Sequence, residues 1–130
     1  MNVIPFSKKH GDICGDMLYR QNIKERDHVY EKDHTFIFLI EGGVAGFFSY
    51  RPEEDKIWLT HFILDEDFRN FQNARDAFDI VKTTMRWLNK DKVYFTPPAK
   101  DERFNRLIRL YFSVVPFKTD DETNYYLIEL

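Results

Sequence analysis

Residues 69–78, RNFQNARDAF, place two arginines and three amide side chains where an apolar segment gives way to a helical pattern. The first amides of a helix are unpaired donors at the positive end of the helix dipole, so such a junction can hold a phosphate. Turns that bind phosphate in this way often use glycine, and this segment contains none. The sequence leaves open whether the segment is an altered cofactor loop or only the cap of a helix.

The hydrophobic pattern predicts the elements that position this segment. Residues 57–64, IWLTHFIL, form an apolar run typical of a buried strand, and similar runs occupy residues 34–40 and 44–50. The turn sequences between them, EGG and RPEEDK, predict three antiparallel strands in a meander. After the junction, apolar residues recur at helical spacing over residues 74–88, which predicts an amphipathic helix that begins at Gln72 or Asn73.

The remaining segments add strands and helices before and after this unit. We predict a strand at 2–6, a helix capped by Ser7, a short helix or loop at 22–33, a strand at 92–96 that ends before Pro97 and Pro98, a helix at 101–115, and strands at 116–119 and 124–130. This order predicts one α+β domain over residues 1–130, a mixed α/β arrangement in which helices cover both faces of a mostly antiparallel sheet of six to seven strands.

Composition excludes several classes of protein. The chain is 43% hydrophobic and 32% charged, which is typical of a globular protein, and no apolar run approaches the roughly 20 residues that span a membrane. A net charge of -3 gives no field that would attract nucleic acid, and we do not expect nucleic-acid binding. The four histidines show no spacing typical of a metal site, so we expect no metal. A single cysteine, Cys14, fits a reducing compartment, and we expect a cytoplasmic protein.

Two short sequence segments relate the predicted elements to a known family. In EGGVAGFF, Gly46 follows a small apolar pair, and in FILDEDFRN the residues Leu64, Phe68 and Arg69 mark the end of a strand and its exit. Their order and spacing resemble the GNAT superfamily of acyl-CoA-dependent N-acyltransferases, and the resemblance covers nearly the whole chain. It implies the GNAT fold.

The chain departs from this family at two informative places. Where the family has Gly-x-Gly-x-Gly or Ala, this sequence has Asn70, Gln72 and Ala74. The family's later Asn, Tyr, Gly and Phe fall on Asn105, Phe112, Pro116 and Phe117, so that the Tyr and the Gly are replaced. Tyr111 lies one residue before the expected tyrosine, and one step turns a helical side chain by about 100°.

The resemblance implies acetyl-CoA as a co-substrate. Its pyrophosphate would lie on backbone amides after the fourth strand, and its pantetheine would pair with the edge of that strand. The cofactor-binding residues so implied are Phe62, Ile63, Leu64, Arg69, Asn70, Phe71, Gln72, Asn73, Ala74, Arg75 and Asn105. Since asparagine tolerates a left-handed backbone, Asn70 and Asn73 are mild replacements for glycine. Arg69 and Arg75 suit a diphosphate, although solvated surface arginines explain them equally well.

Acyl transfer to an amine also needs a base and an acid. His61 is the only titratable side chain well inside the fourth strand and is our candidate base, with a histidine packed on the sheet as the alternative. Tyr111 is the candidate acid, with a bulky core tyrosine as the alternative.

Two functions remain open from the sequence. The first is an N-acyltransferase that acetylates the amine of a small molecule or a peptide. The second is a GNAT-like domain without catalysis, which serves as a binding or assembly module and forms a homodimer through its aromatic-rich end strands. The replaced glycines and tyrosine favour the second, whereas cofactor binding by backbone amides favours the first.

Overall fold

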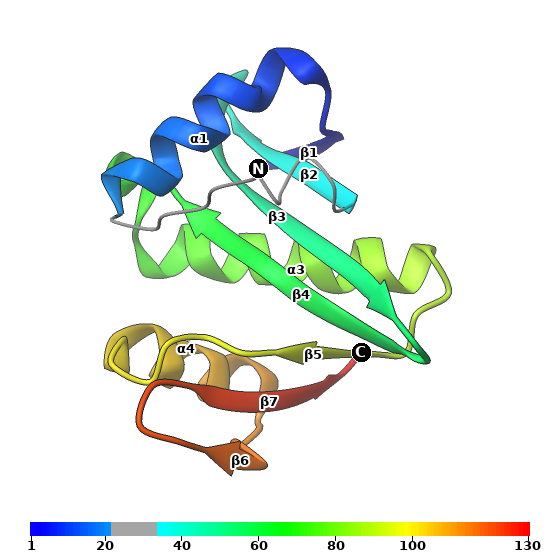
Figure 1. Cartoon of the computed structure of the whole chain (residues 1–130). Helices are drawn as coiled ribbons and strands as arrows, with labels where there is room; N and C mark the ends of the chain where they lie inside the picture. Colours follow the sequence, from blue (N-terminus) through cyan, green and yellow to red (C-terminus); the bar gives the residue numbers. More distant parts are fainter. Residues whose placement is uncertain (22–33) are drawn as a thin grey trace.

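A computed structural model describes residues 1–21 and 34–130 of the chain (Figure 1). The helix or loop predicted at 22–33 lies outside the described residues. The strands are β1 (Asn2–Pro5), β2 (His34–Ile40), β3 (Gly43–Glu53), β4 (Lys56–Leu64), β5 (Lys92–Phe95), β6 (Lys118–Thr119) and β7 (Asn124–Glu129). The helices are α1 (Gly11–Arg20), α3 (Phe71–Trp87) and α4 (Glu102–Phe112), with short 3-10 helices η1 (Lys8–His10) and η2 (Glu66–Phe68).

In the described part of the chain, the strands form one seven-stranded sheet in the order β1-β2-β3-β4-β5-β7-β6. Among these described strands, β4 and β5 pair in parallel and all other neighbours pair antiparallel. The predicted meander of β2, β3 and β4 is confirmed, as is the α+β class. Ser7 precedes η1, which leads directly into α1.

The turn predicted at 51–56 is shorter than expected, because β3 and β4 remain paired as far as Glu53 and Lys56. Pro52 therefore lies inside β3, opposite Ile57. On its other side, β2 pairs with β3 only as far as Tyr50 in the described part of the chain. A strand tolerates proline at such an edge, where no ladder hydrogen bond requires its amide.

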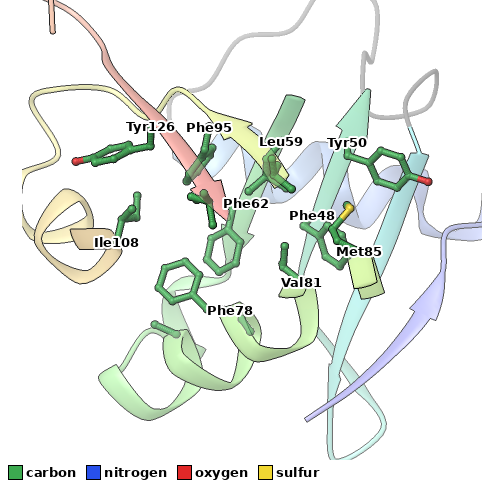
Figure 2. Packing of buried hydrophobic residues seen from close by; sticks show 14 of the residues in the cluster. Phe48, Tyr50, Leu59, Phe62, Phe78, Val81, Met85, Phe95, Ile108 and Tyr126 are labelled. Carbon is green, nitrogen blue, oxygen red and sulfur yellow. The ribbon is translucent and has the colours of Figure 1, made fainter. Parts of the chain in front are cut away.

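The two faces of the sheet carry separate hydrophobic cores, with α1 on one face and α3 on the other (Figure 1). The larger core lies beneath α3 and α4 and is rich in aromatic rings. Figure 2 shows Phe62 of β4 beside Phe78 of α3, and their ring centroids are 4.7 Å apart. The smaller core joins Met17 and Leu18 of α1 to Phe47 and other residues of the sheet. The sheet thus separates two distinct environments.

Strands β4 and β5 diverge after a short contact. They pair only at Trp58 with Tyr94 and at Leu59 with Phe95, and β4 then continues to Leu64 while β5 ends. Figure 1 shows the two strands separating towards the end of β4. This divergence leaves the last part of β4 without a strand neighbour on its β5 side in the described sheet.

A β-bulge and a close strand contact shape β4. The pairs Ser49–His61 and Tyr50–Leu59 leave Thr60 as an extra residue, which reverses the alternation of side chains along the strand. Near the end of β4, a Cβ atom on Gly46 would collide with the carbonyl of Ile63. A glycine is therefore required at position 46 for the close approach of β3 to β4.

Candidate functional site

Helix α3 begins at Phe71, one to two residues earlier than predicted, and Asn70 is its N-cap. The Asn70 side chain accepts a hydrogen bond of 2.8 Å from the amide of Asn73, and its carbonyl accepts one of 3.0 Å from the amide of Ala74. Asparagine is among the best N-cap residues because its short side chain reaches the first-turn amides. The capping interpretation of this segment is therefore correct, and it leaves a further role possible.

Two amides in the first turn of α3 remain open to a ligand. Those of Phe71 and Gln72 lie where a helix has no internal acceptor, and no described residue caps them. The side chain of Gln72 runs along the helix, where its Nε2 donates a 2.9 Å hydrogen bond to Asp76. These two amides are oriented donors at the positive end of a helix of 17 residues.

The segment needs no left-handed residue, contrary to the role that we expected of its asparagines. Asn70 is extended, with φ of -147°, and no residue from 70 to 74 has a positive φ. Asn73 is helical, and its Nδ2 donates to the carbonyl of Phe68 at 2.8 Å. The asparagines stabilise the helix start through their side chains, so the absence of glycine does not strain this backbone.

Arg69 ties the segment to the end of β4. Its Nε donates a 2.9 Å hydrogen bond to the carbonyl of Leu64, which also accepts a longer one of 3.4 Å from Gln21. Beside it, Asp65 forms a salt bridge of 3.1 Å with Arg20 of α1. Arg69 therefore has a structural partner, whereas the predicted contact with a diphosphate remains a prediction.

A cleft of about 290 Å³ lies between α3 and α4, directly beside the first turn of α3. It is lined by Phe71, Ala74, Arg75 and Phe78 of α3 and by Leu107, Leu110 and Tyr111 of α4. At its rim, Phe71 and Leu110 are 60% and 68% exposed, whereas Phe78 at its base is buried. An apolar cleft beside open amides is suited to a ligand that has both an apolar and an anionic part.

Tyr111 lies in this cleft and links the two helices. Its hydroxyl donates a hydrogen bond to the Asp79 carboxylate, and its ring lies 5.2 Å from that of Phe78. Partial burial, followed by the hydrogen bond to Asp79, raises the pKa of Tyr111 to about 12. The hydroxyl is therefore protonated at neutral pH and able to donate. Phe112 packs edge-to-face against the same Phe78 ring.

His61 lies on the opposite face of the sheet from Tyr111. It is buried, pairs with Ser49 of β3, and its ring lies 5.7 Å from that of Phe47, which belongs to the core beneath α1. The structure therefore does not bring the two predicted catalytic side chains together on one face. Only a substrate that passes between the diverging strands would meet both.

Asn105 is buried within the fold. Its Nδ2 donates to the carbonyls of Pro98 and Asp101, both at 2.8 Å, and its Oδ1 accepts from Asn124 and Tyr126, both at 2.9 Å. This network joins the start of α4 to β7 and to the segment after β5. The side chain has a clear structural role, while the predicted contact with a cofactor stays a prediction.

Sequence reasoning missed several residues of the cleft. Leu110 and Asp79 carried no motif that marked the first as a residue of the cleft or the second as a partner of Tyr111. Ala74 and Phe78 are four residues apart and therefore share one face of α3, and this spacing could have indicated the α3 wall of the cleft. The pairing of that wall with α4 depends on a contact between distant segments.

Neither metal binding nor a membrane span is indicated by the described residues. No group of three His, Cys, Asp or Glu side chains there is placed to hold a metal ion. Among the described helices, none is both long and apolar enough to cross a membrane.

Comparison with models of protein families and with curated proteins finds no match to the sequence. The fold, in contrast, is similar to many solved structures. The ribosomal-protein-S18-alanine N-acetyltransferase of Escherichia coli matches with a TM-score of 0.79 at 10% identity, over 98% of this chain and 92% of the other. A GNAT family acetyltransferase of Elizabethkingia anophelis with acetyl-CoA bound matches with a TM-score of 0.78 at 13% identity, over 99% and 97%.

An IAA acetyltransferase of Bacillus cereus matches with a TM-score of 0.77 at 13% identity, over 99% of both chains. At identities of 10–13%, the structural similarity establishes the fold but not the reaction, which has to be argued from the residues of the site. The matches cover nearly the whole of each chain, and the fold predicted from the sequence is confirmed. The protein has the fold of the GNAT acetyltransferases.

Proposed function

We propose that the protein is an acyl-CoA-dependent N-acyltransferase that transfers the acetyl group of acetyl-CoA to an amine. The observation that carries this proposal is the open first turn of α3, whose two amides lie beside the cleft between α3 and α4. A diphosphate is well matched to such amides, because they donate hydrogen bonds at the positive end of the helix dipole. The acetyl-CoA bound to the structurally similar Elizabethkingia protein supports the same ligand.

The divergence of β4 and β5 gives the acyl arm a path. Beyond Leu59 the edge of β4 is unpaired with β5, and a pantetheine can form strand-like hydrogen bonds along residues 62–64. The thioester would then lie between the two faces of the sheet. This position reconciles the location of Tyr111 on one face with that of His61 on the other.

The proposed reaction forms an amide bond and breaks a thioester. The neutral amine attacks the thioester carbonyl, the tetrahedral intermediate collapses, and the thiolate of CoA leaves. His61, directly or through an ordered water, takes the proton of the amine, and Tyr111 or solvent protonates the thiolate. We expect a small-molecule or peptide amine as the acceptor and the cytoplasm as the location.

Thermal unfolding with and without acetyl-CoA tests the proposal. A ligand present at about 100 times its dissociation constant stabilises the folded state by about 2.7 kcal/mol, which raises the midpoint of unfolding by several degrees. We expect such a shift with millimolar acetyl-CoA. If acetyl-CoA, longer acyl-CoAs and free CoA all leave the midpoint unchanged, the chain is a GNAT-like binding or assembly module rather than an acyltransferase.

Substitution of His61 tests the assignment of the base. We expect His61→Ala to lower the rate of acetyl transfer at neutral pH while the dissociation constant of acetyl-CoA stays the same, because His61 lies outside the α3–α4 cleft. Thr35→Ala, a change at another buried polar residue, is the matched control for packing. Equal rates in His61→Ala and the wild type at every pH would show that another group or water acts alone.

A further inference from the structure

Strand β1 lies at one edge of the sheet, and its outer side has no strand partner in the described part of the chain. Its side chains are apolar on both faces, since Val3 packs on the core beneath α3 and Ile4 on the core beneath α1. The other edge strand, β6, has two residues, one of which is Lys118. Short edges, lysines and prolines are common protections against further strand pairing. In β1, with the sequence NVIP, Pro5 is the only such residue.

The backbone of Val3 points away from the sheet. The amide of Phe6 donates a 2.9 Å hydrogen bond to the carbonyl of Thr35, and the β1–β2 register, continued by one residue, places these two residues opposite each other. Hydrogen-bonded pairs alternate along antiparallel strands, so Ile4 also bonds to β2, whereas Val3 and Pro5 direct their backbone groups outward. Proline has no N–H to lose at such a position. Val3 therefore offers both a donor and an acceptor to an added strand.

A groove of about 180 Å³ lies between this edge and α3. It is lined by Val3 of β1 and by Asp79, Ile80, Thr83 and Thr84 of α3. Its volume is below the roughly 300–1,000 Å³ of small-molecule sites, and it suits a single apolar side chain. Asp79 is the only charged residue among those that line it, so the groove favours a basic group at its rim. A side chain on the α3 face of an added strand would enter this groove.

Trp87 extends the same side of α3. It follows Thr83 by four residues and Thr84 by three, and residues so spaced are neighbours on a helix surface. Its side chain is 86% exposed, although tryptophan has a large apolar surface that proteins usually bury in good part. Exposed tryptophans beside a groove are typical anchors of protein–protein contacts. The edge of β1, the groove and Trp87 together have the features of a docking surface.

We propose that β1 binds an extended segment of a partner protein as an additional antiparallel strand. One residue of that segment exchanges two backbone hydrogen bonds with Val3, an arrangement that only antiparallel pairing allows. Residues directly opposite in antiparallel strands share a face, so the same residue inserts an apolar side chain into the groove. The residues two positions away also face α3, where Asp79 and Trp87 favour arginine, because guanidinium groups bind carboxylates and stack on indole rings.

This docking surface goes beyond the proposed acyl transfer and does not depend on it. The groove and the α3–α4 cleft are lined by different residues of α3. Their one direct link is Asp79, whose carboxylate accepts the hydrogen bond of Tyr111. A partner bound at β1 therefore leaves the mouth of the cleft open.

A defined peptide tests the inference. The capped peptide Thr-Arg-Thr-Ile-Thr-Arg-Thr places isoleucine and both arginines on one face of a strand and reads alike in both directions. We expect it to bind the wild type in an NMR titration and to slow hydrogen–deuterium exchange at the amide of Val3. The amide of Phe6, which is already bonded, should be unaffected. N-methylation of the isoleucine removes its backbone donor and should weaken binding about tenfold.

Matched substitutions test the two sides of the groove. Thr83→Arg places a long charged side chain in the groove from an exposed position of α3 and should weaken the peptide about tenfold or more. Thr119→Arg makes the same change at an exposed position of the other edge strand, β6, and should bind normally. Trp87→Ala should weaken the peptide several-fold, whereas Tyr19→Ala, which removes an aromatic ring of similar exposure, 82%, from α1, should have no effect.

Several results would overturn the inference. Equal affinity of the peptide for Thr83→Arg and Thr119→Arg would do so, as would a bound peptide that leaves exchange at the Val3 amide unchanged. Absence of binding to the wild type at millimolar peptide would also do so. Protection of the Val3 amide that increases with protein concentration, without peptide, would show that a second copy of the chain occupies this edge instead. Acetyl transfer is measured separately with acetyl-CoA, so failure here leaves the proposed function standing.

Discussion

Helices α3 and α4 form the two walls of one cleft and begin in similar ways, yet their first turns serve different ends. Asn70 caps α3 through the amide of Asn73, and Asp101 caps α4 through the amide of Phe104. At the start of α4, the buried side chain of Asn105 donates to the carbonyls of Pro98 and Asp101. The amides of the first two residues have no acceptor in the described part of the chain at either helix, but only those of α3, Phe71 and Gln72, lie beside the cleft.

The comparison distinguishes a helix start that stabilises the fold from one that can bind a ligand. Asn105 is buried and has hydrogen-bond partners on every side, which is the pattern of a residue that stabilises a fold. The first turn of α3 is exposed and retains donors next to a cleft, which is the pattern of a site. The comparison predicts that damage at α4 lowers stability first, and that damage at α3 lowers ligand binding first.

The largest expected effect is at Asn105. Asn105→Leu keeps the branched shape of the side chain but removes its hydrogen bonds to Asn124, Tyr126 and two carbonyls, and we expect the free energy of unfolding to fall by about 3 kcal/mol. Urea unfolding measures this change. Gln72→Leu at the exposed start of α3 is the control and should change stability by less than about 0.5 kcal/mol. If Asn105→Leu lowered the free energy of unfolding by no more than Gln72→Leu does, the proposed difference between the two helix starts would be wrong.

The second-largest expected effect is the loss of stability when either N-cap is removed. Asn70→Ala and Asp101→Ala each remove a capping hydrogen bond, and each should cost about 1 kcal/mol of stability in urea unfolding. Only Asn70→Ala should also weaken acetyl-CoA, because it loosens the turn whose amides we assign to the diphosphate. Similar affinities for acetyl-CoA in the two variants would mean that the start of α3 is not the site.

The hydrogen bond between Tyr111 and Asp79 joins the two helices and gives a pH-dependent effect. The pKa of Tyr111 is raised to about 12 in the folded state from an ordinary value of 10.0, so the bond contributes its full stability below pH 10. Above pH 10 the unfolded chain loses this proton first, and the contribution disappears as the pH rises to about 12. We expect the wild type to be more stable than Tyr111→Phe by roughly 0.5–1 kcal/mol at pH 7.

Unfolding of the wild type and of Tyr111→Phe between pH 8 and pH 12 measures this contribution. Because the other tyrosines titrate in both proteins, only the difference between the two curves reports on Tyr111. The difference should be constant at first and then shrink above pH 10. A constant difference across the range would contradict the assigned pKa.

The smallest effect concerns the ends of the same helices. Ser113 follows α4 and Asn89 follows α3, and both have left-handed backbones, with φ of 54° and 60°. Serine tolerates this conformation less well than asparagine, so Ser113→Gly should stabilise the protein by about 0.5 kcal/mol and Asn89→Gly by less. Thermal unfolding of the two variants tests the order. A greater gain at Asn89 would contradict it.

The sequence by itself determined the elements and their order. The apolar runs at 34–40 and 57–64 and the helical stripe at 74–88 carry their period in local residues, so the strands, α3 and the α+β class could be predicted from them. The sequence segments around Gly46 and Arg69 also predicted the GNAT fold, which the structural comparisons confirm. These features depend on neighbours in the chain, which a sequence displays directly.

Only the tertiary structure decided how those elements make a site. Asn70 is the N-cap of α3, and the residues after it have ordinary helical φ angles. Both features depend on the positions of a few atoms, which the residue types alone do not reveal. The bulge at Thr60 turns His61 towards the face of α1, while the packing of α4 against α3 turns Tyr111 towards the cleft. A single extra residue in a strand, or a contact between helices distant in sequence, decides on which face a side chain lies, and no local pattern records either.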